Sequence, residues 1–564
     1  MKDDTVIELK RCITGDVYVD EATRAKYATD ASLFEIVPQV VVVPRDVDDV
    51  RALVRFAGGH GGVSLTARSG GTGMDGGALT ESVVVDFNKY FTHMGEVVCE
   101  GNTGYVVTEP GVFYRDFEKA TLAKNLLMPS YPASRQICTV GGMVANNSGG
   151  EETLQYGKTE NYVRKLKVVL ADGNEYVFEP LTRDALDAKM AQEDFEGELY
   201  RKLFALIDGN YELIQRARPK VSKNSAGYYL WNVWNRDTGV FDLTQLFVGS
   251  QGTLGLITEI TYGLITPAPY SQMMVMFLDD LGRVGDMVGT VLKHHPTTFE
   301  SYDDKTLKLA LKFFWEFVKR LGIPNILTLI VNGIPEGVSM FRHGLPKLVL
   351  QITFDGDDRK VLRQKAEVLA RELKQYEPRY VEIIHSAKEE EEYWLIRRES
   401  FNLLRHKVEG MKTAPFVDDV VVPPDTLSEF LPKLTAIFEP YADRMVYNIA
   451  GHIGNGNFHI IPLMDLTDAR ARAAIPEVAK KVYDLVLSYS GSITGEHNDG
   501  IIRTPYLRQQ FGDGVCRLFE EVKKIFDPKN IFNPGKKVSS TRSTRRGQAA
   551  GTLEYALAHI KTHN

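Results

Sequence analysis

Along the first half of the chain, hydrophobic and polar residues alternate with two periods, one typical of strands and one typical of helices. The apolar run VPQVVVVPRD (Val37–Asp46) predicts a strand. Asp46 is followed by VDDVRALVRFAGGHG, where the spacing of apolar residues predicts a helix that Asp46 caps and that ends in glycines. Strand patterns return in VSLTARSGGTGMDGGALTESVVVDF, at 165–178 and at 245–265. The first half therefore alternates strands with helices, and Asp172-Gly173 predicts a hairpin turn within it.

The pattern changes near TPAPY (Thr266–Tyr270). From there to about residue 440, long helical patterns mix with strands such as PKLVLQITFDG, so we place a domain boundary near Pro267. The region 306–346 contains LALKFFWEFVKRLG and NILTLIVNG, which favour core and cap but would also suit docking on a membrane or a partner. The end of the chain, after Lys537, predicts a flexible basic linker with a short helix at 553–560.

Composition narrows the class of protein. The chain has 564 residues, 43% hydrophobic and 25% charged, which is ordinary for a globular protein of two or three domains. The net charge of -7 argues against a general nucleic-acid binder. The four cysteines form no CxxC pair, so neither an iron–sulfur cluster nor a disulfide framework is predicted. No signal-peptide pattern and no run of ~20 apolar residues is present, so we expect a soluble cytoplasmic enzyme.

A glycine-rich loop carries the first candidate chemistry. Gly71, Gly73 and Gly76 match the dinucleotide fingerprint GxGxxG, but that fingerprint requires a helix directly after the loop. Here the loop runs into the strand pattern Val83–Val85, so a nicotinamide site is not predicted. A glycine loop between two strands still presents backbone N–H groups that can hold a phosphate. A plain tight turn is the alternative interpretation.

Two histidines bracket the second candidate site. In GHIGNGNFH (Gly451–His459), glycines and asparagines disfavour a helix, and a tight reversal at 454–457 is predicted instead. If the flanking segments pair, His452 and His459 face each other with Cβ atoms ~5 Å apart, close enough to share a metal ion. From these residues alone, a metal site and a polar surface turn with two structural histidines are equally favoured.

Four segments resemble, in order, the FAD-binding domain of the vanillyl-alcohol oxidase family. They are ARSGGTGMDGGA, which would hold the pyrophosphate, then Pro129–Gly150, Phe247–Leu264 and Asn530–Lys537. Within that family the chain resembles the FAD-dependent D-2-hydroxyacid dehydrogenases, a branch that includes D-lactate dehydrogenase, D-2-hydroxyglutarate dehydrogenase and the flavin subunit of glycolate oxidase. The resemblance implies an α+β fold, with a two-subdomain PCMH-type FAD-binding domain and a cap domain of antiparallel sheet and helices.

The resemblance also implies the cofactor contacts and the domain limits. The first loop lacks the histidine that links FAD covalently in some relatives, so noncovalent FAD is expected. The implied contacts are Arg68, Ser69, Gly70, Gly71, Thr72, Gly73, Met74, Cys138, Thr139, Gly142, Asn146, Ser148, Gly149, Gly252, Ile257 and Asn533. The implied parts are a FAD-binding domain at 1–267, a cap with the substrate and metal site at 268–490, a segment returning to the FAD-binding domain at 491–537, and a flexible basic tail at 538–564.

A metal site follows from the same resemblance. Members of the branch bind a metal through a GHxGxGNxH loop and a later GEH motif, which this chain has within Ile493–Gly500. His452, His459 and Glu496 would bind one divalent cation, with zinc or manganese expected. Two imidazoles and a carboxylate leave positions open for substrate, as a catalytic site requires. The same ligands would suit a non-haem iron oxygenase, but the flavin motifs count against that alternative.

The remaining implied roles concern proton transfer and carboxylate binding. The resemblance makes His497, next to the ligand Glu496, the base that takes the hydroxyl proton, with a purely supporting role as the alternative. In the helical pattern 386–407, Arg397 lies on an apolar face, and a buried arginine needs an anionic partner. Either the substrate carboxylate or a structural ion pair would meet that need. The family pattern favours the substrate and adds Lys412.

The implied function is oxidation of a D-2-hydroxy acid to its 2-oxo acid, by metal-assisted proton abstraction and hydride transfer to flavin N5. Electrons would leave to a quinone, an electron-transfer flavoprotein, an iron–sulfur protein or oxygen, and peripheral contact with the inner face of the membrane is a further expectation. Ile461 stands where D-2-hydroxyglutarate dehydrogenases tend to have asparagine, and Asn498 replaces the last glycine of GEHG. A non-catalytic FAD-binding electron-transfer subunit is the alternative class.

Overall fold

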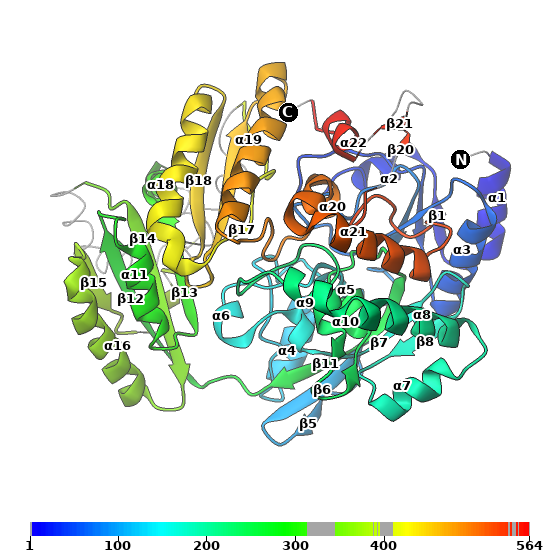
Figure 1. Cartoon of the computed structure of the whole chain (residues 1–564), viewed down its shortest axis with the longest axis horizontal. Coiled ribbons are helices and arrows are strands. Elements are labelled where there is room, and N and C mark those ends of the chain that lie inside the picture. Colours follow the sequence, from blue (N-terminus) through cyan, green and yellow to red (C-terminus); the bar gives the residue numbers. More distant parts are fainter. Residues whose placement is uncertain are drawn as a thin grey trace.

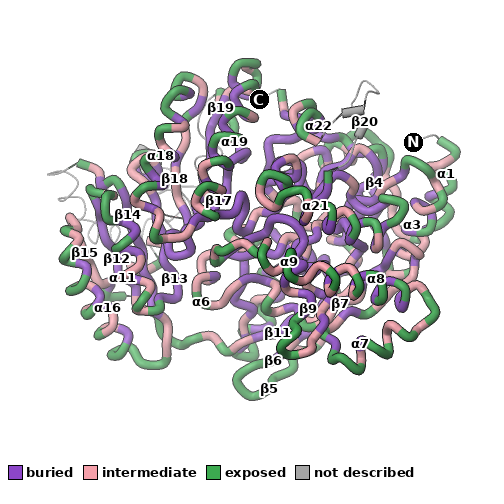
Figure 2. Tube along the Cα trace, viewed as in Figure 1, coloured by how far each residue is buried: buried purple, intermediate pink, exposed green. Residues whose placement is uncertain are grey.

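The computed structural model has two lobes, connected where the chain runs from β11 (Leu256–Ile265) to β12 (Tyr270–Leu278) (Figure 1). The structure describes residues 3–312, 344–386, 388–391, 393–394, 397, 410–539, 542–543, 549–550 and 552–562. The predictions for 313–343 and 398–409 lie outside these residues. Buried positions run through the interior of both lobes, with exposed positions along the outer helices and loops (Figure 2).

The first lobe contains two main sheets. The four-stranded sheet has the order β1-β2-β4-β3, and β4 pairs parallel with both β2 and β3. The antiparallel five-stranded sheet has the order β5-β6-β11-β7-β8. The other strands of this lobe are β1 (Asp16–Tyr18), β2 (Val40–Val43), β3 (Leu65–Arg68), β4 (Val83–Asp86), β5 (Val98–Glu100), β6 (Thr103–Thr108), β7 (Val163–Val169), β8 (Glu175–Phe178), β9 (Trp234–Asn235) and β10 (Val240–Phe241).

Local signals in the first lobe were read correctly from the sequence. Asp46 caps the predicted helix, because its carboxylate accepts a hydrogen bond of 3.0 Å from the backbone N–H of Asp49. No helix lies between β3 and β4, so the glycine loop connects two strands as predicted. The helices of the lobe are α1 (Asp3–Cys12), α2 (Glu21–Lys26), α3 (Val47–Gly59), α4 (Tyr114–Leu122), α5 (Val140–Asn146), α6 (Thr153–Tyr156), α7 (Arg183–Met190), α8 (Phe195–Gly209), α9 (Tyr211–Ala217) and α10 (Thr244–Phe247).

The second lobe, called the cap below, is built on one antiparallel eight-stranded sheet. Its order is β15-β12-β14-β13-β18-β19-β16, and β17 also pairs with β19. The further strands are β13 (Thr298–Asp303), β14 (Leu348–Gly356), β15 (Tyr380–Ile383), β16 (Lys412–Thr413), β17 (Val420–Val421), β18 (Met445–His452) and β19 (Asn457–Met464). The helices are α11 (Val284–Leu292), α12 (Asp304–Lys312), α16 (Arg359–Leu373), α18 (Leu427–Phe438) and α19 (Ala469–Ser488). Antiparallel sheets with helices confirm the predicted α+β class.

Alternation along the cap strands separates two faces. Met274 and Met276 of β12 belong to the large core that includes residues of α11, α16, α18 and α19. Met273, Val275 and Phe277, which point the other way, form a smaller cluster with residues of β13, α12 and the segment 393–394. The second face therefore stands apart from the four covering helices, and it is the face that carries the candidate site.

The chain returns from the cap to the first lobe after residue 490. Helix α21 (Leu507–Phe526) packs against α8 and α9, and α20 (Gly500–Arg503) precedes it. The predicted flexible tail needs a correction, because α22 (Thr552–Ala558) packs on the first lobe. The backbone N–H of Glu35 donates to the carbonyl of His559 (2.9 Å), and Tyr555 is buried. The apolar side chains of this helix explain the packing, and the sequence had predicted a helix there.

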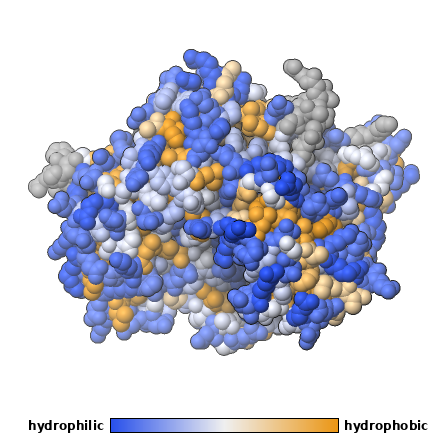
Figure 3. Space-filling view, viewed as in Figure 1, coloured by the Kyte–Doolittle hydropathy of each residue, from blue (hydrophilic) through white to orange (hydrophobic). Residues whose placement is uncertain are grey.

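No helix in the described part of the chain has both the length and the apolar character needed to cross a bilayer. The face of the molecule seen in Figure 3 is largely hydrophilic, and its apolar side chains form separate patches.

Candidate active site

The glycine loop after β3 packs backbone to backbone against the second flavin-like segment. A Cβ on Gly70 would lie 2.3 Å from the carbonyl oxygen of Ile137, and a Cβ on Gly142 would lie 2.4 Å from Oγ of Ser69. Such close approach is open only to glycine, because every other residue carries a Cβ. The loop and the N-terminal half of α5 therefore lie together.

Asn533 joins this loop to the third and fourth segments. Its side-chain amide donates to the carbonyl oxygens of Gly77 (2.9 Å) and Gln251 (2.7 Å). Its Oδ1 accepts from the hydroxyl of Thr66 (3.0 Å), which is 467 positions away in the chain. The four segments that carry the resemblance thus converge on one region of the first lobe.

Two further expected cofactor residues, Arg68 and Cys138, are held inside the protein in this region. The Arg68 guanidinium donates to the carbonyl oxygens of Tyr27 (3.2 Å) and Thr29 (2.8 Å). Cys138 is buried, and burial raises the pKa of its thiol to about 12, so it stays a neutral thiol at physiological pH. The other expected residues in the same four segments are Gly71, Thr72, Gly73, Met74, Thr139, Asn146, Ser148, Gly149, Gly252 and Ile257.

The two motif histidines lie on a hairpin, but in a different register from the predicted one. β18 and β19 pair so that His452 is opposite Asn457 and His459 is opposite Ala450. The histidines are diagonal neighbours rather than directly opposed, because the reversal lies at 453–456, one residue earlier than predicted. Their rings still lie 5.2 Å apart between centroids, at a steep angle to each other. Proximity was predicted correctly, and the pairing was not.

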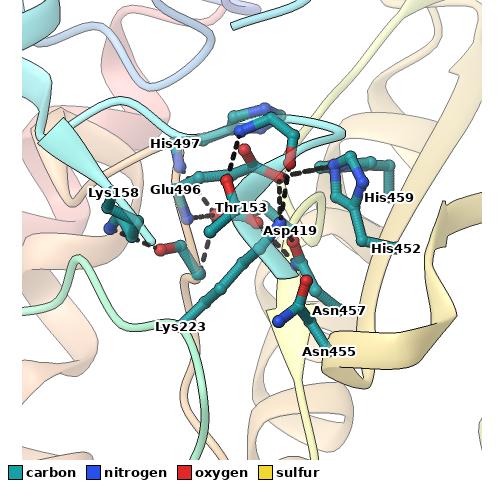
Figure 4. A network of polar contacts seen from close by, with 12 residues as sticks. Thr153, Lys158, Lys223, Asp419, His452, Asn455, Asn457, His459, Glu496 and His497 are labelled. Atoms are coloured by element: carbon teal, nitrogen blue, oxygen red, sulfur yellow. Dashed lines mark hydrogen bonds and ion pairs between the residues drawn. The ribbon is translucent and has the colours of Figure 1, made fainter. Parts of the chain in front are cut away.

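Glu496 completes a convergent set of three possible metal ligands. Nε2 of His452 lies 2.9 Å, and Nε2 of His459 lies 3.3 Å, from Oε1 of Glu496. One ligand atom from each of the three residues lies within 4.8 Å of the others. Figure 4 shows the two imidazoles together on the cap side of Glu496. Two nitrogens and one oxygen are donors that suit zinc or another borderline divalent cation, so the residues fit the expected metal.

Buried carboxylates hold the opposite nitrogens of these imidazoles. Nδ1 of His452 lies 2.7 Å from Oε1 of Glu300, and Nδ1 of His459 lies 3.3 Å from Oδ1 of Asp418. Asp418 also lies 2.5 Å, through Oδ2, from Nδ1 of His497. A carboxylate on Nδ1 favours the tautomer whose Nε2 lone pair faces the site, which is the usual arrangement around metal-binding histidines.

Asp419 shapes the loop that carries Glu496 and His497. Its Oδ2 accepts backbone N–H groups from Gly495 (2.8 Å), Glu496 (2.8 Å) and His497 (2.7 Å), together with the hydroxyl of Thr494 (2.6 Å). Burial acts to raise the pKa of Asp419, but the charge of His497 and the other cations outweighs it, and the pKa is lowered. One anionic oxygen thus binds the backbone of three consecutive residues and the side chain of the residue before them (Figure 4).

Lys223 is a functional candidate that the sequence did not reveal. Its side chain is fully buried, and Nζ lies 3.4 Å from each of Oε1 of Glu496, Oδ1 of Asn457 and the carbonyl oxygen of Gly150. Burial acts to raise the pKa of Glu496, but the charges of Lys223 and His452 outweigh it, and the pKa is lowered well below its usual value. Lys223 lies in a stretch without helix or strand pattern, so only the fold reveals its position.

The two expected carboxylate-binding cations lie in different places. The Arg397 guanidinium forms an ion pair with Glu300, and its side chain is 12% exposed. It therefore joins the chain of contacts that runs through Glu300 to His452. Lys412 is exposed and pairs with Met464, five residues beyond His459 on β19. That register places Lys412 about 17 Å along the strand and on the opposite face, so the structure does not bring it to the site.

The segment after Glu496 connects the cap site to the flavin-like segments. The amide of Asn146 donates to the carbonyl oxygen of Glu496 (2.8 Å). Asn498 has a φ of 71° and donates through its amide to the carbonyl oxygens of Asn146 (3.1 Å) and Gly249 (2.9 Å). Asparagine tolerates this left-handed conformation, which explains why it can replace the expected glycine. One candidate metal ligand, Glu496, is therefore hydrogen-bonded through its backbone to an expected cofactor segment.

Comparisons with known proteins agree with this arrangement. The family described as "FAD binding domain" matches residues 38–178, and the family described as "FAD linked oxidases, C-terminal domain" matches residues 268–537. The chain is 28% identical to a D-2-hydroxyglutarate dehydrogenase of Pseudomonas putida over 93% of its own length and 50% of the relative. It is 27% identical to a D-lactate dehydrogenase of Anaerostipes hadrus over 93% of its length and 94% of the relative.

The chain therefore spans about half the length of the D-2-hydroxyglutarate dehydrogenase of Pseudomonas putida. Among solved structures, the 4-ethylphenol oxidase of Gulosibacter chungangensis has the same fold, with a TM-score of 0.66 and 17% identity. That match covers 95% of this chain and 96% of the other.

Proposed function

We propose, because this chain belongs to the family of FAD-linked oxidases, that it oxidises a D-2-hydroxy acid to the corresponding 2-oxo acid. The proposal rests above all on one observation. Residues 494–498 are hydrogen-bonded both to the cap, through Asp419, and to the flavin-like segments, through Asn146 and Gly249. The candidate metal ligands, which are His452, His459 and Glu496, thus lie next to the region where members of the family bind FAD. Relatives that carry names of D-2-hydroxyacid dehydrogenases support the substrate class.

Two groups from outside the chain supply chemistry that amino acids lack. Noncovalent FAD would accept the hydride of the carbinol carbon at flavin N5. One zinc or manganese ion on His452, His459 and Glu496 would polarise the hydroxyl and lower its pKa. Glu300 supports that ligand set by its hydrogen bond with Nδ1 of His452, and the carboxylate of Asp418 lies 3.3 Å from Nδ1 of His459.

His497 is the residue that takes the hydroxyl proton in this proposal. Asp418 accepts from its Nδ1, so the lone pair of Nε2 is directed away from Asp418 and can receive the proton. Burial acts to lower the pKa of His497, but the charges of Asp418 and Asp419 outweigh it, and the pKa is raised. A more basic imidazole is a better proton acceptor, and the backbone bond to Asp419 keeps the residue in place.

Arg397 remains the candidate for the substrate carboxylate. A guanidinium has five N–H donors, so an ion pair with Glu300 is compatible with a second anion on another edge. The position of Arg397 in the chain of contacts to His452 supports this role, whereas the exposed Lys412 has no place in it. No electron acceptor is proposed.

Anaerobic flavin reduction tests the proposal. Metal-loaded enzyme is mixed with D- and L-enantiomers of lactate, 2-hydroxybutyrate, malate and 2-hydroxyglutarate, and loss of the oxidised-flavin absorbance is followed. At least one D-acid is expected to reduce the flavin within a single turnover, and its L-enantiomer is expected to be far slower. If no D-2-hydroxy acid reduces the flavin of metal-loaded enzyme, the proposed reaction is wrong.

A further inference from the structure

The site-bearing face of the cap sheet also carries a group of buried polar side chains beside the histidines. Thr298 of β13 pairs with Thr353 of β14, and Glu300 of β13 pairs with Gln351 of β14. Paired residues, and residues two apart on one strand, point to the same face of a sheet, so all four share one face. Each is 3% exposed or less.

Three of these side chains have a hydrogen-bonding atom without a partner. Within the described residues, Oγ1 of Thr298, Oγ1 of Thr353 and Oε1 of Gln351 accept or donate no hydrogen bond. The amide nitrogen of Gln351 donates to the carbonyl oxygen of Tyr393 (3.1 Å), which fixes Oε1 as an outward-facing acceptor. Buried polar atoms are normally paired, so three neighbouring unpaired atoms point to a missing hydrogen-bonding partner.

This group is continuous with the candidate metal site. Glu300, which pairs with Gln351, contacts Nδ1 of His452 at 2.7 Å. Thr298 is two residues from Glu300 along β13, or about 7 Å. The two threonines therefore lie beside Glu300 on the face that carries the histidines, where the tail of a bound 2-hydroxy acid could extend.

We propose that Thr298, Thr353 and Gln351 form a subsite for the substrate tail, and that this tail carries a hydroxyl group. This inference rests on the proposed function and names its substrate class: a D-2-hydroxy acid with at least one hydroxyl beyond the second carbon. A hydroxyl can donate to Oε1 of Gln351 and exchange hydrogen bonds with both threonines. An alkyl tail would leave all three atoms unpaired.

The surroundings disfavour a second carboxylate in the same place. Oε1 of Gln351 only accepts, so it would repel a carboxylate oxygen. Asp355 follows Thr353 on the same face of β14, and Glu390 accepts from the hydroxyl of Ser271, which pairs with Asp355. Asp355 and Glu390 place two acidic groups at this end of the subsite, which disfavours a dicarboxylate tail there.

Three D-acids with four carbons test the subsite, because they differ only at the tail. They are D-2-hydroxybutyrate, D-2,4-dihydroxybutyrate and D-malate, with single-turnover flavin reduction of the metal-loaded holoenzyme as the readout. One neutral hydrogen bond changes affinity by roughly 2–12-fold, so the dihydroxy acid is expected to be preferred by at least that factor. A preference for D-malate, or equal use of the three, overturns the inference while leaving the proposed reaction in place.

Matched threonine variants locate the effect. Thr298→Val and Thr353→Val should each reduce the ratio of dihydroxybutyrate to hydroxybutyrate reactivity by roughly 2–12-fold without lowering the melting temperature, because no internal bond is lost. Thr297→Val is the control: the Thr297 hydroxyl accepts from the backbone N–H of Asp355 (2.9 Å), so this variant should lose stability and keep the ratio.

A final variant checks the direction of the tail. Asn448 lies opposite Ile461 on the far side of the histidine pair, and its Oδ1 also has no partner among the described residues. Asn448→Leu should leave the substrate ratio unchanged. If Asn448→Leu changes the ratio and the threonine variants do not, the tail runs the other way and the subsite is wrong. If none of the three acids reduces the flavin, the proposed function fails and the subsite fails with it.

Discussion

In the flavin-like segments of the first lobe, glycines without a side chain let neighbouring segments approach closely. The candidate metal-ligand cluster is instead held together by pairs of imidazole and carboxylate side chains. At Gly70 the carbonyl oxygen of Ile137, and at Gly142 the side chain of Ser69, occupies the space where a Cβ would lie. At His452, His459 and His497, each ring nitrogen that faces away from the site meets a carboxylate. The first region should therefore be sensitive to added volume, and the second to a change of charge or donor type.

The two regions also differ in the interactions that hold their residues together. The flavin-like segments are joined by hydrogen bonds to backbone carbonyl oxygens, such as those from Asn533. The candidate metal-ligand cluster instead contains several buried carboxylates: Glu300, Asp418, Asp419 and Glu496 are all at most 3% exposed. Breaking one partner of such a charge network costs more than breaking a neutral bond, because the remaining charge stays buried.

The largest effect is expected from loss of the metal. Chelation, or His452→Ala, should abolish substrate-dependent flavin reduction while the protein keeps its FAD, because both histidine ligands lie in the cap and the flavin-like segments lie in the other lobe. FAD content and single-turnover reduction are the measurements. His294→Ala, which removes another cap histidine that contacts Glu372, is the control. Normal reduction by metal-free enzyme would remove the metal from the proposed reaction.

The next effect separates the base from the ligand. His497→Ala should slow flavin reduction by roughly 10²–10⁴-fold and leave metal and FAD bound, because only the proton acceptor is lost. Glu496→Gln should instead lose metal, and added metal should partly restore its rate. Metal content, FAD content and single-turnover rate are compared for both variants. Metal loss in His497→Ala with metal retention in Glu496→Gln would show that the two roles are reversed.

A smaller effect is expected at Glu152, a partly buried carboxyl group of the first lobe. Burial raises its pKa to about 7, the hydrogen bond from Tyr131 opposes this, and the charge of Glu151 adds to it. The native state therefore holds the proton more tightly than the unfolded state, so stability is present below pH 4.5 and is lost as the pH rises to about 7.

Glu152→Gln has no such proton to lose. Relative to this variant, the wild type should become less stable by up to about 3 kcal/mol between pH 4.5 and pH 7.5. Urea unfolding of both proteins at several pH values measures the difference. A constant difference across this range would mean that Glu152 titrates normally in the folded protein.

The smallest effect is expected from added side-chain volume in the flavin-like segments. Gly70→Ala adds a methyl group that would meet the carbonyl oxygen of Ile137, and overpacking of this kind costs about 1–3 kcal/mol. FAD should bind more weakly to this variant, while metal content stays unchanged. Gly61→Ala is the control, because a Cβ at Gly61 would meet no atom within 4 Å. Equal FAD affinity of the two variants would argue against tight backbone packing at the loop.

Local patterns predicted the first lobe better than the cap site. The Asp46 cap, the strand–loop–strand glycine segment and the hairpin at Asp172-Gly173 depend on residues close in sequence, and the structure contains all three. The resemblance located His452, His459 and Glu496, and the structure brings them together. The hairpin register failed because the turn geometry, not the spacing of the two histidines, decides which residues oppose each other.

The supporting residues could not be read from the sequence. Lys223, Glu300 and Asp418 come from different elements of both lobes, and their contacts with the site depend on the tertiary fold alone. A weak signal existed for Asp418 and Asp419, two acids directly before the buried strand β17. Lys412 failed for the opposite reason, because a family position was carried over although the strand register places it on the other face.

The double attachment of residues 494–498 has a mechanical consequence. The same five residues are bonded to Asp419 in the cap and to Asn146 and Gly249 in the first lobe. A swing that opened the two lobes would have to break one set of these bonds, and breaking the bonds to Asp419 would separate Glu496 from His452 and His459. The segment therefore acts as a strap between the lobes that resists a hinge motion at this joint.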